Sequence, residues 1–249
     1  SAALPADGNN VEYPVRVTNT ADADEQAAEG DTLAYGAIEI TSATSPIKTY
    51  GGYTNMSRQL VERSSVNYVD AAFRAMVAKY AAVTNAAARA HLGTATGFNT
   101  SSVASWDADD VLEMLADAAV KVNGDTGKSL DFILTSADVF KALAKTVDGS
   151  NRPLLSNVGA TVNTFGSINP VGLTGNILGL PIVLDPSLAG GSLFVGNRSA
   201  VATFESAGAP LRLTDSDITN LTNTMSVYGY AAIASLDPKA MVKVANPLD

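Results

Sequence analysis

The sequence contains no cysteine, which excludes a disulfide framework, a thiolate metal site and a cysteine nucleophile. It also lacks any apolar run of about 18 residues or more, so no membrane-spanning helix is expected. Residues 1–10, SAALPADGNN, have neither the basic region nor the apolar region of a signal peptide. We interpret them as a start that processing or truncation has already trimmed.

Basic residues are scarce as well, and the formal net charge is −9. A nucleic-acid binder needs a basic stripe that displaces counterions from phosphates, so this function class is disfavoured. A protein that only encloses nucleic acid remains possible. Charged residues make up 16% of the 249 and apolar residues 46%, which argues against disorder and allows one large domain or two small ones to bury a core.

Catalytic motifs are weak. His91 is the only histidine, and a Ser-His-Asp triad would have to use it, yet no GxSxG elbow supplies the serine. His91 falls in the last turn of a predicted helix, where a surface or capping role is expected. The stretch GDTGKS, residues 124–129, resembles the end of a phosphate loop, but the first glycine of that motif would fall at position 122, which is valine. A phosphate loop also joins a strand to a helix, whereas this stretch is expected to join a helix to a strand. We therefore interpret it as a turn.

An acidic stretch, TADADEQAAEGDT, occupies residues 20–32 and contains no basic residue. The flanking residues 11–18 and 33–41 alternate in the period of a strand, with Leu33 and Tyr35 on one face, so they are predicted to pair as a long hairpin with an acidic tip. The tip could be a solvated loop, a calcium site or a contact surface. It lacks the residue order of an EF-hand. Its carboxylates are Asp22, Asp24, Glu25, Glu29 and Asp31.

The clearest element is a helix from Val66 to Leu92, whose apolar residues recur at helical spacing. It would be roughly 40 Å long. Ser64 or Ser65 can cap its start, and Gly93 fits the position just after its end.

The rest of the chain mixes helices and strands, which predicts an α+β fold. A second helix is expected from Ser105 or Asp107 to about Val122, and a third over 137–147 with Ser136 as its cap. Strands are expected at 48–57 with a bend at Gly51 and Gly52, and at 130–136, 176–185, 192–206, 210–217, 224–235 and 239–245.

The order of these pieces resembles the major capsid proteins of tailed bacteriophages. An acidic hairpin precedes YTNMSRQLVERSS and a long helix that ends near AAARAHL. The stretch LDFILTSADVFKALAKTVDGSNRPLL resembles the strand, helix and Gly/Arg/Pro loop of the axial domain in that family. LGLPIVLDPSLAGGSLFVGNRSAVATFES and DSDITNLTNTMSVYGYAAIASLDPKAMVKV are similar to its later strands. The resemblance covers nearly the whole chain from about residue 11.

This resemblance implies the tailed-phage capsid fold, an α+β fold with an extended β-hairpin loop, a long spine helix and a mixed α/β axial domain. The implied segments are a trimmed N-terminal segment at 1–10, the extended loop at 11–47, a peripheral domain at 48–105 with 200–233, and the axial domain at 106–199 with 234–249.

The function implied is that of a structural subunit, not an enzyme, with no cofactor or metal. It would self-assemble as pentamers and hexamers into an icosahedral shell around the double-stranded DNA of a tailed phage or prophage. Expected partners are further copies of the chain and scaffolding, portal, protease and cement proteins, without sequence-specific DNA contacts and without a membrane. The expected location is the virion capsid, assembled in the host cytoplasm.

The resemblance also implies contact residues. The acidic tip would meet basic residues of a neighbouring subunit, for which Arg58, Arg63 and Arg74 are candidates, and Arg152 is a further candidate in the loop at 148–157. In some members a lysine of the extended loop bonds covalently to an asparagine of a neighbour. Asn220 lies near that asparagine position, but residues 19–37 contain no lysine, so a noncovalent shell is expected.

Other functions remain open at this stage. A bacterial encapsulating nanocompartment would share the fold and hold protein cargo. A secreted surface adhesin module would fit the Ala/Thr/Gly-rich acidic composition and should be a monomeric all-β protein. A hydrolase would need a clustered base and nucleophile, which one histidine and no cysteine make difficult to supply.

Overall fold

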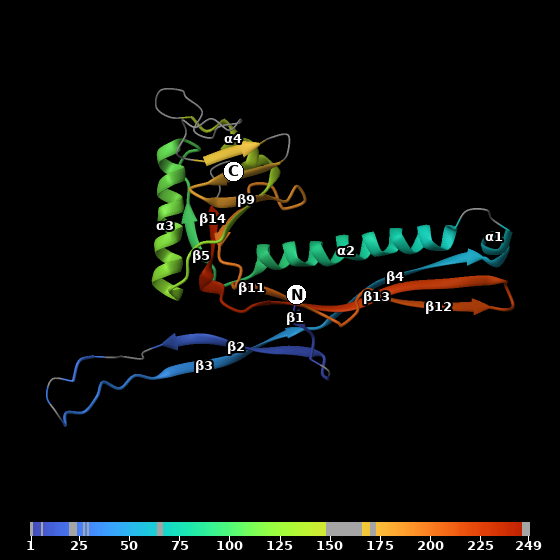
Figure 1. Cartoon of the computed structure of the whole chain (residues 1–249), viewed down its shortest axis with the longest axis horizontal. Coiled ribbons are helices and arrows are strands. Elements are labelled where there is room, and N and C mark those ends of the chain that lie inside the picture. Colours follow the sequence, from blue (N-terminus) through green and yellow to red (C-terminus); the bar gives the residue numbers. More distant parts are fainter. Residues whose placement is uncertain are drawn as a thin grey trace. The chain divides into compact units, whose positions relative to one another are not determined.

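The computed structural model describes residues 2–5, 7–19, 24–26, 28, 30–63, 67–147, 166–169 and 173–245. The chain divides into two compact units, residues 1–88 with 202–236 and residues 89–201 with 237–249. Each unit combines strands with helices (Figure 1). The predicted α+β class is confirmed.

A two-stranded hairpin occupies the N-terminal part of the first unit (Figure 1). Strand β2 (Asn10–Asn19) pairs antiparallel with β3 (Ile38–Pro46), so the predicted hairpin is confirmed. Its second strand was expected to start at Leu33 but starts at Ile38, and residues 31–37 are not in a strand. The small residues of the LAYGA stretch favour strands poorly. The Ser45 hydroxyl donates to the Ile233 carbonyl oxygen at 2.7 Å and joins the hairpin base to the neighbouring sheet.

That neighbouring sheet is built around the long strand β13 (Thr222–Ser235), which pairs antiparallel with β4 (Lys48–Ser57) and with β12 (Leu211–Asp217). Strands β11 (Val201–Glu205) and β1 (Ala2–Ala3) extend it. The bend predicted at Gly51 and Gly52 is wrong, since β4 and β13 pair in continuous register through both residues. A Cβ at Gly51 would lie 2.8 Å from the Cβ of Tyr228, so close strand packing requires this glycine.

Two helices follow β4, α1 (Arg58–Arg63) and the long α2 (Tyr68–Thr94). Phe73 and Tyr80 of α2 are buried against Met225 and Val227 of β13. This apolar contact explains why the predicted long helix forms, since packing of one face stabilises a helix more than its intrinsic propensity does.

The predicted ends of this helix need correction. Asn67 caps the start, because its Oδ1 accepts the backbone N–H of Asp70 at 3.1 Å. The proposed caps Ser64 and Ser65 lie outside the described residues. Gly93 lies inside the last turn rather than after it. The helix continues to Thr94, whose hydroxyl bonds the Ala90 carbonyl at 2.9 Å.

The second unit contains a 7-stranded sheet with the order β5-β14-β10-β6-β9-β8-β7. Helix α3 (Ala108–Thr126) and helix α4 (Ala137–Lys145) contribute to its main apolar core, with Ala118, Val122, Val139, Ile133, Val195 and Val242 among the most buried residues. The strands are β5 (Asn99–Ser102), β6 (Phe132–Thr135), β7 (Gly166–Asn169), β8 (Thr174–Ile177), β9 (Leu180–Leu184), β10 (Leu193–Gly196) and β14 (Met241–Ala245), and a 3-10 turn, η1, spans Pro238–Ala240.

Local signals set the ends of α3. The carboxylate of Asp107 accepts the backbone N–H of Asp110 at 3.0 Å, as an N-cap does. The helix ends at Gly127, whose φ of 68° is left-handed. Helix α3 continues to Thr126, beyond the predicted end at about Val122, so the first half of GDTGKS is helical and the predicted turn begins only at Gly127.

Ser136 occupies the N-cap position of α4, but its side chain makes no capping bond to the backbone. Its hydroxyl donates to the carboxylate of Asp138 instead. Asp138 also accepts the backbone N–H of Gly191 at 2.6 Å. The capping role predicted for Ser136 is wrong, because the nearby carboxylate is the stronger acceptor.

Residues 89–105 belong to the second unit in this division, whereas the sequence placed them with the long helix. The reason is local, since β5 within this segment pairs in parallel with β14. In the part of the chain that the structure describes, we find no helix with the length and hydropathy needed to cross a bilayer.

Candidate intersubunit surfaces

The hairpin tip presents bare carboxylates. Asp24, Glu25 and Asp31 are all exposed, and none forms an ion pair with another described residue. Local hydrogen bonds join these residues: the backbone N–H of Glu25 donates to the Asp24 carboxylate at 2.8 Å, and the Gln26 side chain donates to the Asp31 carbonyl at 2.7 Å. Neither bond neutralises a carboxylate. The other two predicted tip residues, Asp22 and Glu29, lie outside the described residues. The described tip is thus an acidic surface with no cation of its own.

Two large side chains next to the acidic tip were expected to share a strand face. Leu33 is instead 68% exposed and Tyr35 90% exposed, in a segment that is not a strand. A tyrosine combines an apolar ring with a polar hydroxyl, which suits it to interfaces. This exposure was not predicted, because the alternating pattern suggested that both side chains would pack.

The basic candidates lie on α1 and α2. The Arg58 guanidinium pairs with Glu62 at 2.7 Å and Arg74 pairs with Asp70 at 2.8 Å, both one helical turn apart and exposed. Hydrogen bonding and attraction from Glu62 raise the pKa of Arg58. Exposed pairs of this kind stabilise a fold little. Arg63 is exposed and has no ion pair among the described residues, so of these three candidates it is the one whose guanidinium is not already engaged by a carboxylate of its own helix.

Asn220 lies in the loop between β12 and β13, where Asp217 organises the turn. The Asp217 carboxylate accepts backbone N–H groups from Thr219 at 2.8 Å and Asn220 at 3.3 Å, and the Asn220 side-chain amide at 2.8 Å. These bonds, with that from Thr219 the strongest, lower the pKa of Asp217. The loop exposes Ile218, which is 86% accessible and was missed by the sequence analysis. Arg152 lies outside the described residues.

His91 is in the last turn of α2, as predicted. Burial lowers its pKa, which favours the neutral imidazole and weakens the expected attraction to the helix C-terminus. Among the described residues, no group of three or more His, Asp or Glu side chains is arranged to hold a metal ion.

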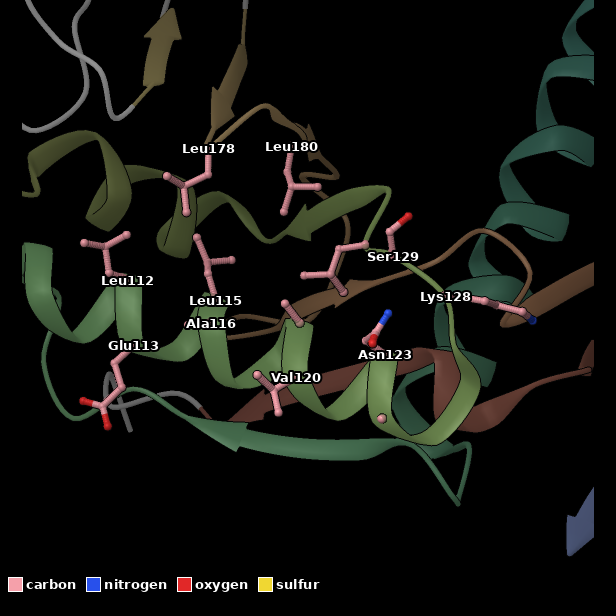
Figure 2. A pocket seen from close by; sticks show the side chains of 13 residues that line it. Leu112, Glu113, Leu115, Ala116, Val120, Asn123, Lys128, Ser129, Leu178 and Leu180 are labelled. Carbon is pink, nitrogen blue, oxygen red and sulfur yellow. The ribbon is translucent and has the colours of Figure 1, made fainter. Parts of the chain in front are cut away.

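The second unit carries an apolar groove of about 970 Å³ between α3 and the turn that joins β8 to β9. Figure 2 shows Leu178 and Leu180 facing α3, across from Leu112 and Leu115. Val120 lines the groove from α3 and is 71% exposed, and Leu178 is 52% exposed. Exposed apolar surface of this extent commonly marks a contact site.

The two ends of the groove carry side chains of opposite charge (Figure 2). Glu113 lies toward one end, and Lys128 toward the other, where its Nζ contacts Asp237 at 2.7 Å and Ser199 at 2.9 Å. Leu178 occupies the left-handed backbone region with a φ of 51°, followed by Gly179 at 83°. Asparagine is the usual residue at such a first turn position.

We compared the chain with models of known protein families and with curated proteins. The model of the family described as "Phage capsid protein" matches residues 40–244. A search of curated proteins found no match.

Several solved structures have a similar fold. The capsid of an empty GTA particle has a TM-score of 0.68 at 11% identity, over 99% of this chain and 87% of that one. The mature capsid of bacteriophage PhiM1 gives 0.67 at 12%, over 98% and 84%. A chain from Mycobacterium phage Che8 gives 0.64 at 17%, over 96% and 85%. These identities are low, so the likeness concerns the fold.

Proposed function

The chain belongs to the phage capsid protein family, and on that premise we propose that its copies form pentamers and hexamers of an icosahedral shell around double-stranded DNA. The main support for this proposal is the family match over residues 40–244. The protein is a structural subunit of a capsid and its place is the virion shell. We propose that it has no enzymatic activity, needs no cofactor and assembles in the host cytoplasm.

The two units suggest how the family's domains map onto this chain. We assign the hairpin at 11–47 to the extended loop. The sheet around β13, with α2 packed on it, corresponds to the peripheral domain with its spine helix. The second unit, with its 7-stranded sheet, corresponds to the axial domain.

The hairpin is the first proposed contact. Its tip is acidic, exposed and without a cation of its own, while Arg58, Arg63 and Arg74 are exposed on α1 and α2. The tip of one copy would lie on the peripheral domain of the next, with Tyr35 adding apolar contact. Charge pairing of this kind sets register and orientation more than affinity. Repetition around a closed shell then turns weak contacts into a stable assembly.

We propose that the shell is held noncovalently. Residues 19–37 contain no lysine that could bond to a neighbour, and the Asn220 amide is engaged by Asp217 at 2.8 Å. Asn220, Ile218 and Arg152 would then serve as ordinary contact residues. A separate cement protein is a natural partner for such a shell, alongside scaffolding, portal and protease proteins.

The charge also suits an enclosing role. A net charge of −9 disfavours tight binding of DNA phosphates, so packaged DNA could move past the shell without sequence-specific contacts. The adhesin alternative predicted an all-β monomer, which the α+β fold contradicts. The nanocompartment alternative shares the fold, but the family match is to phage capsid proteins.

Light scattering on purified protein tests the proposal over a range of concentrations. We expect a cooperative transition from subunits to large particles of uniform size. A protein that stays monomeric at high concentration would contradict the shell function.

A further inference from the structure

Tyr35 is the most exposed of the large apolar side chains that the structure describes, with 90% of its surface accessible. It lies four residues after Asp31, in the segment that leads from the acidic tip to β3 and is not a strand. Tyrosine is enriched among the residues that dominate binding energy, because its ring is large and rigid and carries one polar group. Tyr35 therefore has the exposure and the chemistry of an anchor for a partner molecule.

The first unit also carries a pocket of about 420 Å³, lined by residues of α1, α2, β12 and β13. Met225, which is 2% exposed, and the half-buried Val61 and Val69 give this pocket apolar surface. Thr214 and Ser216, which are both exposed, add hydroxyl groups. An apolar interior with a few polar groups matches a tyrosine ring and its hydroxyl.

We propose that this pocket receives Tyr35 of another copy, with the ring against the apolar lining and the phenol hydroxyl beside the polar groups. The partner is thus a second copy of the chain. This inference rests on the proposed function, because it names the anchor and the pocket of the hairpin contact stated there.

The charges beside the anchor and beside the pocket are complementary. The tip carries exposed carboxylates that form no ion pair with a described residue, namely Asp24, Glu25 and Asp31. On the receiving side, Val61 lies between Arg58 and Arg63 in α1, and Arg74 follows Val69 by five residues in α2. A guanidinium has five N–H donors, so an arginine that already pairs within its helix can also reach a carboxylate of the tip.

Carboxylates near the pocket reduce this attraction without reversing it. Two of them pair with Arg58 and Arg74 on the same helices, and Asp215 lines the pocket. These anions balance the arginines, in a chain whose net charge is −9. An acidic tip therefore meets less repulsion here than on the average surface of the chain. The charges set the register of the contact, while the buried ring supplies its affinity.

Tyr35 and the pocket are different surfaces of one chain, so the contact is head-to-tail. Each copy gives its hairpin to one neighbour and offers its pocket to another. Contacts of this kind generate closed rings when the rotation between copies closes. The proposal thus uses a contact type from which pentamers and hexamers can be built.

A photoreactive residue at position 35 tests the contact. Tyr35 is replaced with p-benzoylphenylalanine, the protein is irradiated at assembly concentration, and crosslinked multimers are digested with trypsin for mass spectrometry. The control carries the same residue at Tyr53, which is 75% exposed on β4. The pocket residues Val61, Val69 and Met225 fall in the tryptic peptides 59–63, 64–74 and 213–239.

We expect position 35 to crosslink to these three peptides at least about tenfold more than position 53, because a docked ring has a high effective concentration in the pocket. Adducts spread over other peptides, or equal yields from the two positions, would overturn the contact.

Tyr35→Ala gives a second readout, since it removes the anchor and leaves the subunit's core untouched. The variant should melt like the unmodified subunit and should need at least about tenfold more protein to assemble. Tyr35→Phe keeps the ring and should lose less, and Tyr53→Ala should assemble normally. Unchanged assembly of Tyr35→Ala, or an equal loss in Tyr53→Ala, would overturn the role of Tyr35.

Failure of this inference differs from failure of the proposed function. If the unmodified protein forms particles but position 35 gives no adduct on these peptides, the inference fails and the proposed function stands. If the adducts form but closed particles never appear, the contact stands and the shell function fails.

Discussion

Reversing the charge of the hairpin tip should weaken assembly and leave the subunit's fold intact. The variant replaces Asp24, Glu25 and Asp31 with lysine. All three side chains are exposed and unpaired among the described residues, so the free energy of unfolding should change by no more than about 0.5 kcal/mol. Each replacement changes the charge by two, which moves the formal net charge from −9 to about −3.

The size of the assembly effect follows from exposed ion pairs. Each pair with an arginine of the neighbour would contribute about 0.2–1 kcal/mol. Losing three raises the concentration needed for assembly by roughly 3- to 100-fold. Like charges then face each other, so the loss should be greatest at low salt and should shrink as the Debye length falls to about 8 Å near physiological ionic strength.

A control of equal charge separates this contact from a general charge effect. Asp7, Glu12 and Asp215 are also exposed, and replacing these three with lysine gives the same net charge. A lower net charge alone reduces repulsion between copies and should favour association. Light scattering and thermal melting are recorded for both variants. Equal assembly of the two, or a tip variant that melts several degrees lower, would show that the acidic tip is not a specific contact between copies.

Three further predictions concern the fold. Asp107→Ala removes the N-cap of α3 and should lower the midpoint of unfolding in urea titration. Gly229→Ala places a Cβ 2.4 Å from the Tyr80 hydroxyl oxygen and should cost about 1–3 kcal/mol in the same assay, whereas a smaller loss would mean that Tyr80 moves freely. The hydrogen bond from Arg89 at 2.6 Å lowers the pKa of Asp185. The ionised Asp185 therefore contributes fully to the stability of the fold above the unfolded pKa of about 3.9. This contribution is lost as pH falls through the lower folded pKa, and Asp185→Asn should flatten the acid side of stability against pH.

Local signals were enough to predict much of the fold. The long helix and the hairpin follow from the spacing of their apolar residues, and the start of α3 follows from its capping residue Asp107, signals that act over a few residues. The role of Gly51 was misinterpreted, because a glycine is needed there for the close approach of Tyr228, a residue far along the chain. The exposure of Leu33 and Tyr35 was missed because an alternating pattern cannot show where a strand begins.

The contact surfaces were only partly accessible to sequence reasoning. The acidic tip is visible as composition, but the groove at Val120 joins a helix to the turn between β8 and β9, and only tertiary packing brings them together. The left-handed conformation of Leu178 carries no sequence signal, since leucine is an unusual residue for such a turn.

Negative-stain electron microscopy of the purified, unmodified protein at assembly concentration would show whether copies of this chain build a shell. We expect closed shells of uniform diameter, built from rings of subunits, that the tip-reversed variant forms poorly. Fields that contain only monomers or irregular aggregates would contradict the claim that this protein is a shell-building subunit.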